Sequence, residues 1–235
     1  MLRRDDIYET IATPYEVLIS KEDNGGNIPA ALSELADFDG KDVIDLGAGT
    51  GRLTCMAAPL AKSILAVDFA AGMLQVTAQK LTRMGLSNWR TAVADYRRVP
   101  AEDQSADIVM AGWTIGYVAS TNHAEWEDNL RQVMEEIERL LRPGGIAIIL
   151  ETLGTGYEEP TPPDFLVSYY KALEERYGFR HRWIRTDYRF DSAEQAEALC
   201  RDFFGDEAAD RIRENKTCIV PECTGIWWRG REAGP

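Results

Sequence analysis

Residues 42–53 read DVIDLGAGTGRL, and this stretch decides the fold class. It contains the apolar residues Val43, Ile44 and Leu46, a short run of the kind that forms a buried strand. Glycines then alternate with other residues, and a helical pattern begins near Arg52. A strand that passes through glycines directly into a helix is typical of a nucleotide-binding turn in a parallel α/β sheet, because glycine lets backbone approach a ligand and the helix N-terminus offers unpaired N–H groups. The turn consists of Gly47, Ala48, Gly49, Thr50 and Gly51.

Three interpretations of this turn are open. A dinucleotide site needs Gly-x-Gly-x-x-Gly, whereas Arg52 stands here where the third glycine of that pattern would be. Asp45, just before the turn, is a poor neighbour for a pyrophosphate but a good one for a cation such as the amino group of a methionine moiety. The third interpretation is a structural turn without a ligand. Spacing and charge favour the methionine-derived cofactor.

These residues resemble a known family. The segment DLGAGTG at residues 45–51 is similar to the first motif of the class I, Rossmann-like methyltransferases that depend on S-adenosylmethionine, in particular their small-molecule type. LRPGG at residues 141–145 resembles a second hallmark, in which glycine ends a helix and permits a tight turn into a strand. The resemblance implies an α/β fold with a seven-stranded, mostly parallel sheet in the order 3-2-1-4-5-7-6, strand 7 antiparallel, helices on both faces and an N-terminal helical lid.

The length suits one α/β domain with a modest elaboration, so residues 1–235 are expected to form a single methyltransferase domain. Residues 1–38 would supply the helical lid. Residues 154–178 open with prolines and continue as a helical pattern with an apolar face. This segment is expected to be a helical insertion near the acceptor site.

Acidic residues follow the second and third predicted strands. Asp68 can accept both hydroxyl hydrogens of a ribose, or it can cap the following helix. Phe69 and Met73 are spaced to flank a flat ring, and the resemblance implies that they pack on adenine, although ordinary core packing competes closely for Met73. The resemblance also implies that Asp95 accepts a hydrogen bond from the adenine amino group and that Tyr96 lies near the base. The alternatives are a loop carboxylate and a cap on the sheet.

Aromatic residues follow the fourth predicted strand. Gly112, Trp113 and Tyr117 lie where ligands bind in such sheets, outside the carboxyl end of a central strand. The resemblance puts this segment beside the methionine part of the cofactor and the acceptor, with two hydrophobic plugs as the alternative. It also implies that Tyr15 belongs to the lid over the cofactor, where the alternative is an aromatic side chain packed on the sheet edge.

The amino-acid composition of the chain limits the kinds of molecule that it is expected to bind. Lys and Arg number 26 and Asp and Glu 39, for a net charge of −13, and no basic stripe appears, so no nucleic acid is expected. The four cysteines form no Cys-x-x-Cys pair and there are two histidines, so no metal site is expected. The chain opens without a signal peptide, and no apolar run approaches the ~20 residues of a membrane span. We therefore expect a cytoplasmic monomer or homodimer that does not contact membranes.

The expected reaction transfers a methyl group from S-adenosylmethionine to an oxygen or nitrogen of a small molecule and leaves S-adenosylhomocysteine. An in-line displacement needs mainly positioning, and a general base only where the acceptor must lose a proton. The candidate bases are His123, His181 and Glu151, each of which also has an ordinary structural explanation. Two alternatives stay open: a cofactor-binding sensor or partner subunit without catalysis, and a protein or peptide side-chain methyltransferase that docks its substrate along residues 180–185.

Overall fold

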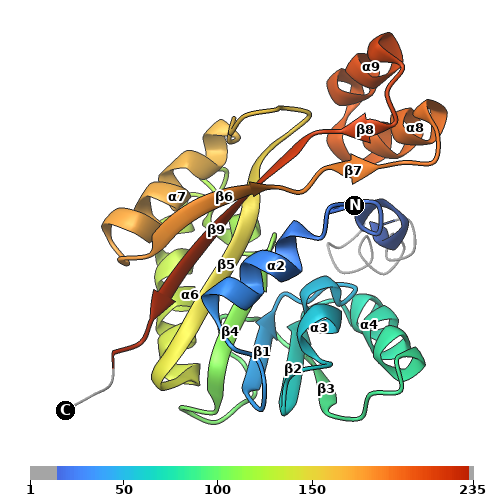
Figure 1. The fold of residues 1–235 in the computed structure, drawn as a ribbon. Helices are drawn as coiled ribbons and strands as arrows, with labels where there is room; N and C mark the ends of the chain where they lie inside the picture. The colour runs from blue at the N-terminus through green and yellow to red at the C-terminus, as the bar shows by residue number, and fades with distance from the viewer. Residues whose placement is uncertain (1–14, 233–235) are drawn as a thin grey trace.

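The computed structural model describes residues 15–232, and a seven-stranded sheet forms its centre (Figure 1). In spatial order the strands are β3 (Trp89–Val93), β2 (Ser63–Asp68), β1 (Asp42–Leu46), β4 (Ala106–Gly112), β5 (Leu141–Thr155), β9 (Glu222–Gly230) and β6 (Arg180–Arg185). Strand β9 runs antiparallel to both of its neighbours, β5 and β6, and the other six strands of this sheet run in one direction. Because β9 is the seventh strand of the sheet in chain order, the predicted order 3-2-1-4-5-7-6 with an antiparallel seventh strand is confirmed.

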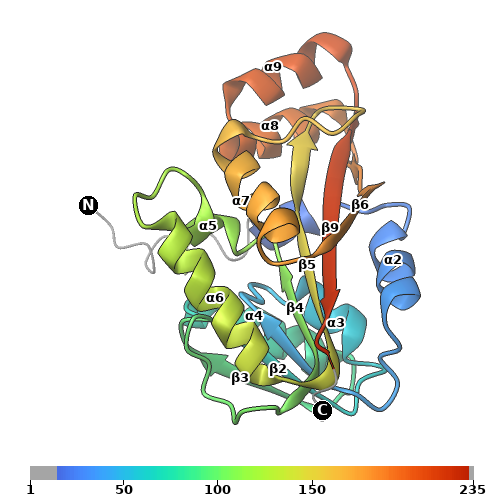
Figure 2. The same ribbon diagram turned by 90° about the vertical axis from the view of Figure 1, so that its left-hand side faces the viewer.

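Alternating side chains along the central strands build a core on each face of the sheet. Ile44 and Val109 point to one face, and Val43 and Ile108 point to the other. The first face is covered by α5 (Gly116–Ala119), α6 (Trp126–Leu140) and α7 (Asp164–Glu175), and the second by α2 (Asn27–Leu35), α3 (Arg52–Ala57) and α4 (Ala71–Arg83). Figure 2 shows α6 and α7 on one side of the sheet and α2 and α3 on the other. Helices on both faces were predicted, and this is confirmed.

No helix connects β3 to β4; the connection is an irregular loop over residues 94–105. Helix α6 holds this loop in place. Glu136 Oε1 accepts a hydrogen bond from the Val99 backbone N at 2.6 Å, and Arg139 donates to the carbonyl oxygens of Val99 and Ala101 at 3.1 and 2.8 Å. The buried Glu136 carboxylate and the Arg139 guanidinium therefore hold the loop against α6 by hydrogen bonds, in the absence of a connecting helix.

The last third of the chain adds a small lobe beyond the carboxyl ends of the parallel strands (Figures 1 and 2). The lobe consists of β7 (Tyr188–Arg189), β8 (Ile219–Val220), α8 (Ala193–Phe204) and α9 (Asp206–Asn215). Strands β7 and β8 pair only with each other, so the lobe is not part of the main sheet. Pro221 separates β8 from β9, because proline has no backbone N–H to donate to a neighbouring strand.

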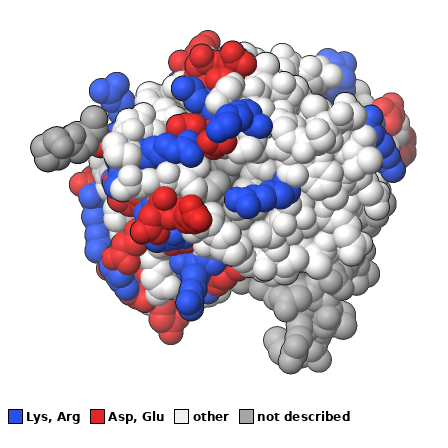
Figure 3. All heavy atoms as spheres, turned by 90° about the horizontal axis from the view of Figure 1, so that it is seen from below, with Lys and Arg blue, Asp and Glu red and all other residues white. Residues whose placement is uncertain are grey.

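Residues 15–19 are helical, and residues 1–14 of the predicted lid lie outside the described residues. Within residues 15–232, no helix is long and apolar enough to cross a membrane. The same part of the chain contains no group of three or more His, Cys, Asp or Glu side chains arranged to hold a metal ion. On the face seen in Figure 3, basic and acidic side chains are interspersed rather than gathered into a basic stripe.

Candidate active site

The glycine turn between β1 and α3 uses its three glycines for different purposes. All three have positive φ, 64° at Gly47, 54° at Gly49 and 82° at Gly51. A Cβ on Gly47 would lie 2.0 Å from the Thr114 hydroxyl oxygen, and one on Gly51 would lie 2.7 Å from a Thr77 methyl carbon. A Cβ on Gly49 would meet no atom of residues 15–232 within 4 Å. Gly47 and Gly51 are therefore required for packing, whereas Gly49 faces open space.

Two carboxyl groups flank this turn. Asp45 is 1% exposed, and its Oδ2 accepts a hydrogen bond from the Thr54 hydroxyl at 2.5 Å. Burial raises the pKa of Asp45 to about 7. Asp68 accepts hydrogen bonds from the backbone N of Gly49 at 2.8 Å and of Ala70 at 2.9 Å, and burial raises its pKa. The Asp68 carboxylate thus ties the turn to β2 while lying beside the space that Gly49 leaves open.

A small pocket lies over the turn, with a volume of about 60 Å³. Ten predicted cofactor residues line it: Tyr15, Asp45, Gly47, Ala48, Gly49, Asp68, Phe69, Met73, Gly112 and Trp113. The Thr50 hydroxyl oxygen is buried at its wall and has no hydrogen-bond partner in the part of the chain that the structure describes. Ligand pockets usually measure ~300–1,000 Å³, so side chains must move to admit a nucleotide. The Arg52 guanidinium lies 4.0 Å from the centre of the Trp113 ring, and this pair fills part of the space.

Three predicted cofactor residues do not line this pocket. Gly51 packs on Thr77, as described above. Hydrogen bonds from Arg97 hold the Asp95 carboxylate and lower its pKa, although partial burial acts in the opposite direction. Tyr96 is 5% exposed, and its hydroxyl donates to the Thr114 carbonyl oxygen at 3.1 Å. In this structure Asp95 is therefore hydrogen-bonded to a residue of its own loop, and Tyr96 is buried in the core.

A much larger cavity, of about 850 Å³, adjoins the small pocket. Five side chains line both spaces: Tyr15, Ile19, Arg52, Trp113 and Tyr117. The predicted insertion 154–178 supplies one wall through residues such as Tyr157, Pro162 and Phe165. The lobe supplies another through Phe203 and Phe204 of α8. The cavity is therefore enclosed by segments that are far apart in sequence and meet beyond the carboxyl ends of the central strands.

The three candidate bases occupy different places. Glu151 lines the large cavity, and its Oε1 accepts hydrogen bonds from the Gly116 backbone N at 3.0 Å and from the Tyr169 hydroxyl at 3.4 Å. Burial raises the pKa of Glu151 to about 7. His123 also lines this cavity. His181 lines neither space; its ring stacks on Trp227 with centroids 4.4 Å apart.

Among residues 15–232, six charged residues that line the large cavity were not predicted as site residues, and three of them, Glu22, Arg52 and Glu222, are largely buried. Glu22 and Arg52 form an ion pair at 2.7 Å with side chains only 2% and 12% exposed. Glu222 is 2% exposed and accepts a hydrogen bond from the Thr152 hydroxyl at 2.6 Å. One local signal was available for Arg52, which replaces the third glycine of a dinucleotide pattern. No local pattern marks Glu22 or Glu222, because their neighbours come from distant segments.

Comparison with known proteins agrees with this geometry. Residues 44–149, which span the glycine turn, both flanking carboxyl groups and most of β5, match the family model for a methyltransferase domain. By sequence, this segment is therefore similar to a methyltransferase domain. The fold is also similar to that of a solved structure, a SAM-dependent methyltransferase from Aquifex aeolicus, with a TM-score of 0.59. The sequence identity is 16%, and the superposition covers 97% of this chain and 98% of the other.

Relatives of the methyltransferase domain include two acyl-carrier-protein enzymes. Malonyl-[acyl-carrier protein] O-methyltransferase of Yersinia pestis is 32% identical over 114 residues, which cover 48% of this chain and 37% of the relative. Malonyl-[acyl-carrier protein] O-methyltransferase 1 of Coxiella burnetii is 26% identical over 200 residues, which cover 81% of this chain and 59% of the relative. The chain therefore matches less than two thirds of the length of either relative.

Proposed function

We propose that the chain transfers a methyl group from S-adenosylmethionine to an oxygen or nitrogen of a small-molecule acceptor. The observation that carries the proposal is the wall of five side chains shared by the small pocket and the large cavity. A cofactor over the glycine turn and an acceptor in the large cavity would meet at this wall. Relatives named as O- and N-methyltransferases support the two acceptor types, although a C-methyltransferase is also among them.

The residues of the small pocket fit S-adenosylmethionine. Gly49 leaves room for a ligand, the Thr50 hydroxyl lacks a partner, and the Asp45 carboxyl suits the amino group of the methionine moiety. Asp68 would turn its carboxylate toward the ribose hydroxyls. When bound, this cofactor supplies an electrophilic methyl group attached to a sulfonium. The chain's own contribution is to hold two reactants in line and to exclude water with the aromatic side chains of the shared wall.

Among the candidate bases, Glu151 has the strongest support. It is fully enclosed at the carboxyl end of the sheet, it lines the acceptor cavity, and a pKa near 7 suits a group that accepts a proton at neutral pH. The Tyr169 hydroxyl and the Gly116 N–H fix its orientation. We propose that Glu151 removes the proton from an acceptor hydroxyl or ammonium before or during the transfer.

Three further parts of the proposal concern the lid over the cofactor, the cellular compartment and the oligomeric state of the chain. Tyr15 lines both spaces and would act with the segment before it as the lid, and the insertion 154–178 would shape the acceptor site. The free thiols of Cys55, Cys200, Cys218 and Cys223 suit a reducing, cytoplasmic compartment. A monomer or homodimer is proposed, and light scattering of the purified protein tests it.

Calorimetric titration of the purified chain with S-adenosylmethionine, S-adenosylhomocysteine and NAD tests the cofactor assignment. We expect micromolar binding of the first two and none of NAD. Binding of NAD alone would overturn the proposal, because it would mean that Arg52 does not exclude a pyrophosphate. Binding of S-adenosylmethionine without methyl transfer to any member of an amine and alcohol panel would instead favour a sensor.

A further inference from the structure

The large cavity is lined by more carboxyl groups than guanidinium groups. Its lining contains five carboxyl side chains and two guanidinium groups: Glu22, Glu151, Asp164, Glu207, Glu222, Arg52 and Arg211. The inner guanidinium is already matched, because Arg52 pairs with Glu22 at 2.7 Å and both side chains are buried. Arg211 lies over the Tyr157 ring, 4.8 Å from its centre. An anionic acceptor would therefore enter a cavity whose inner positive charge is already neutralised.

Glu222 differs from the other acidic residues of the cavity because one of its oxygens is buried and unpaired. The side chain is 2% exposed and lines the cavity. Its Oε1 accepts from the Thr152 hydroxyl at 2.6 Å, whereas Oε2 is buried and has no hydrogen-bond partner among residues 15–232. Its backbone N donates to Asp187 Oδ1 at 3.1 Å, which fixes the start of β9. Buried polar atoms are almost always paired, so an unpaired oxygen on a carboxyl side chain that lines a cavity indicates a missing hydrogen-bond partner.

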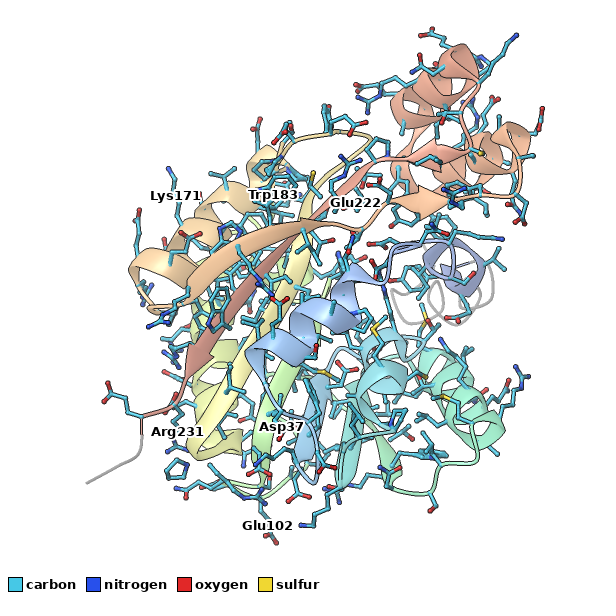
Figure 4. The ribbon with its side chains drawn as sticks, in the orientation of Figure 1. Asp37, Glu102, Lys171, Trp183, Glu222 and Arg231 are labelled. Carbon is cyan, nitrogen blue, oxygen red and sulfur yellow. The ribbon has the colours of Figure 1, made fainter. Side chains whose placement is uncertain are left out.

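Figure 4 shows where Glu222 lies: at the start of β9, between the main sheet and the lobe. Burial, and then the charge of Glu22, raise the pKa of Glu222 to about 8, while the hydroxyls of Thr152 and Thr155 and the Arg52 guanidinium favour its charged form. Other titratable groups that interact with it are Tyr170 of α7, Tyr188 of β7, Cys200 of α8 and Cys223 of β9. None of these four supplies a positive charge. A cation would relieve the repulsion between Glu222 and Glu22.

We propose that the acceptor carries a protonated amine and that Glu222 binds this ammonium group through Oε2. The inference rests on the proposed function and deepens it. Glu222 lines only the large cavity and not the small pocket, so the ammonium serves as an anchor rather than as the nucleophile. A protonated amine has no lone pair and cannot accept a methyl group. The atom to be methylated lies at the other end of the acceptor, beside the shared wall.

The aromatic lining indicates the rest of the acceptor. The cavity is also lined by aromatic rings, which give it apolar surface in addition to the Glu222 carboxyl group: those of Tyr15, Phe165, Phe203 and Phe204. A flat, apolar molecule with an ammonium group at one end matches this arrangement. On binding, the ammonium displaces the proton that Glu222 holds near neutral pH, and that proton passes to the solvent.

Three amines, each compared with the matching alcohol, test whether Glu222 binds an ammonium group. 2-Phenylethylamine, 3-phenylpropylamine and 4-phenylbutylamine are titrated at pH 7 into the chain saturated with S-adenosylhomocysteine, each against the corresponding alcohol. We expect at least one amine to bind tenfold or more tightly than its alcohol. The binding enthalpy should differ between phosphate and Tris buffers by the amount expected for proton release.

Substitutions separate the anchor from the fold. Glu222→Gln keeps the size of the side chain, and we expect it to remove the preference for the amine and the released proton while leaving S-adenosylhomocysteine affinity within twofold. Glu214→Gln, an exposed change on α9 outside the cavity, should retain both. Equal binding of amine and alcohol, a preference that survives in Glu222→Gln, or no binding by any amine would overturn the inference. Failure of S-adenosylhomocysteine to bind the parent chain would instead overturn the proposed function.

Discussion

Gly47 and Gly49 lie two residues apart in one turn, yet substitution should affect them differently. A Cβ at Gly49 enters open space, so Gly49→Ala should destabilise the fold by only about 1–2 kcal/mol, the penalty for a side chain at positive φ. The added methyl would occupy cofactor space, and S-adenosylmethionine affinity should fall about tenfold or more, which is ~1.4 kcal/mol or more. Thermal unfolding and calorimetry measure the two effects.

Gly47→Ala is the comparison variant. Its Cβ would lie 2.0 Å from the Thr114 hydroxyl oxygen, so backbone must shift, and we expect a loss of more than about 3 kcal/mol in unfolding free energy. If both variants unfold alike and Gly49→Ala still binds the cofactor as the parent does, the glycine turn is not the cofactor site.

Glu151 and His123 line the same cavity, and kinetics can distinguish them. If Glu151 is the base, the rate of methyl transfer should rise as pH increases through about 7 and then level off, because the carboxyl must be ionised to accept a proton. Glu151→Gln should lower kcat by about 100-fold, abolish this pH dependence and leave cofactor affinity unchanged. The reverse pattern, with a normal Glu151→Gln and an inactive His123→Gln, would assign the base to the histidine.

At the scale of elements, α6 does two jobs: its apolar face packs on the sheet, and its buried Glu136 holds the loop between β3 and β4. Glu136→Ala leaves the Val99 N–H unpaired and Arg139 without its buried partner. We expect a loss of about 1–3 kcal/mol of unfolding free energy in urea denaturation. Glu135→Ala, on the same helix, removes only an exposed ion pair with Arg131 and should change stability by less than about 0.5 kcal/mol. Equal losses would mean that the loop is held by other contacts.

The elements of the sheet were predictable because each is encoded locally. Apolar periodicity marks strands and helices, and the motif at residues 45–51 supplies four of the ten predicted pocket residues: Asp45, Gly47, Ala48 and Gly49. The lobe was not placed by the sequence, since long-range contacts hold it: Lys21 pairs with Asp191 at 2.8 Å, and the ring centres of Tyr15 and Phe203 lie 6.1 Å apart. Glu222 became a candidate only once these contacts closed the cavity.

At the scale of the whole molecule, three buried carboxyl groups make stability depend on pH. The pKa values of Asp45, Glu151 and Glu222 are raised to about 7, 7 and 8 by burial. Between pH 4 and 8 the folded chain therefore holds protons that the unfolded chain has lost, so unfolding free energy should fall as pH rises through this window.

This pH effect is measured by the melting temperature of the ligand-free chain, which we expect to be lower at pH 8.5 than at pH 5.5. Glu151→Gln removes one of the three ionisations and should flatten the decline. A melting temperature that increases from pH 5.5 to 8.5 in the parent would mean that these carboxyl groups are ionised without penalty, which contradicts their burial.

The lobe formed by β7, α8, α9 and β8 is a continuous segment of chain inserted between two strands of the main sheet. The glycine turn and its flanking carboxyl groups come from an earlier, separate stretch. Natural selection can therefore remodel the lobe, lengthen it or exchange it while leaving the sequence of the glycine turn unchanged. Proteins that descend from one ancestral chain could then differ in their acceptors while keeping the same methyl donor. Chimaeric proteins in which the lobe is exchanged at residues 187 and 221 would test this separation.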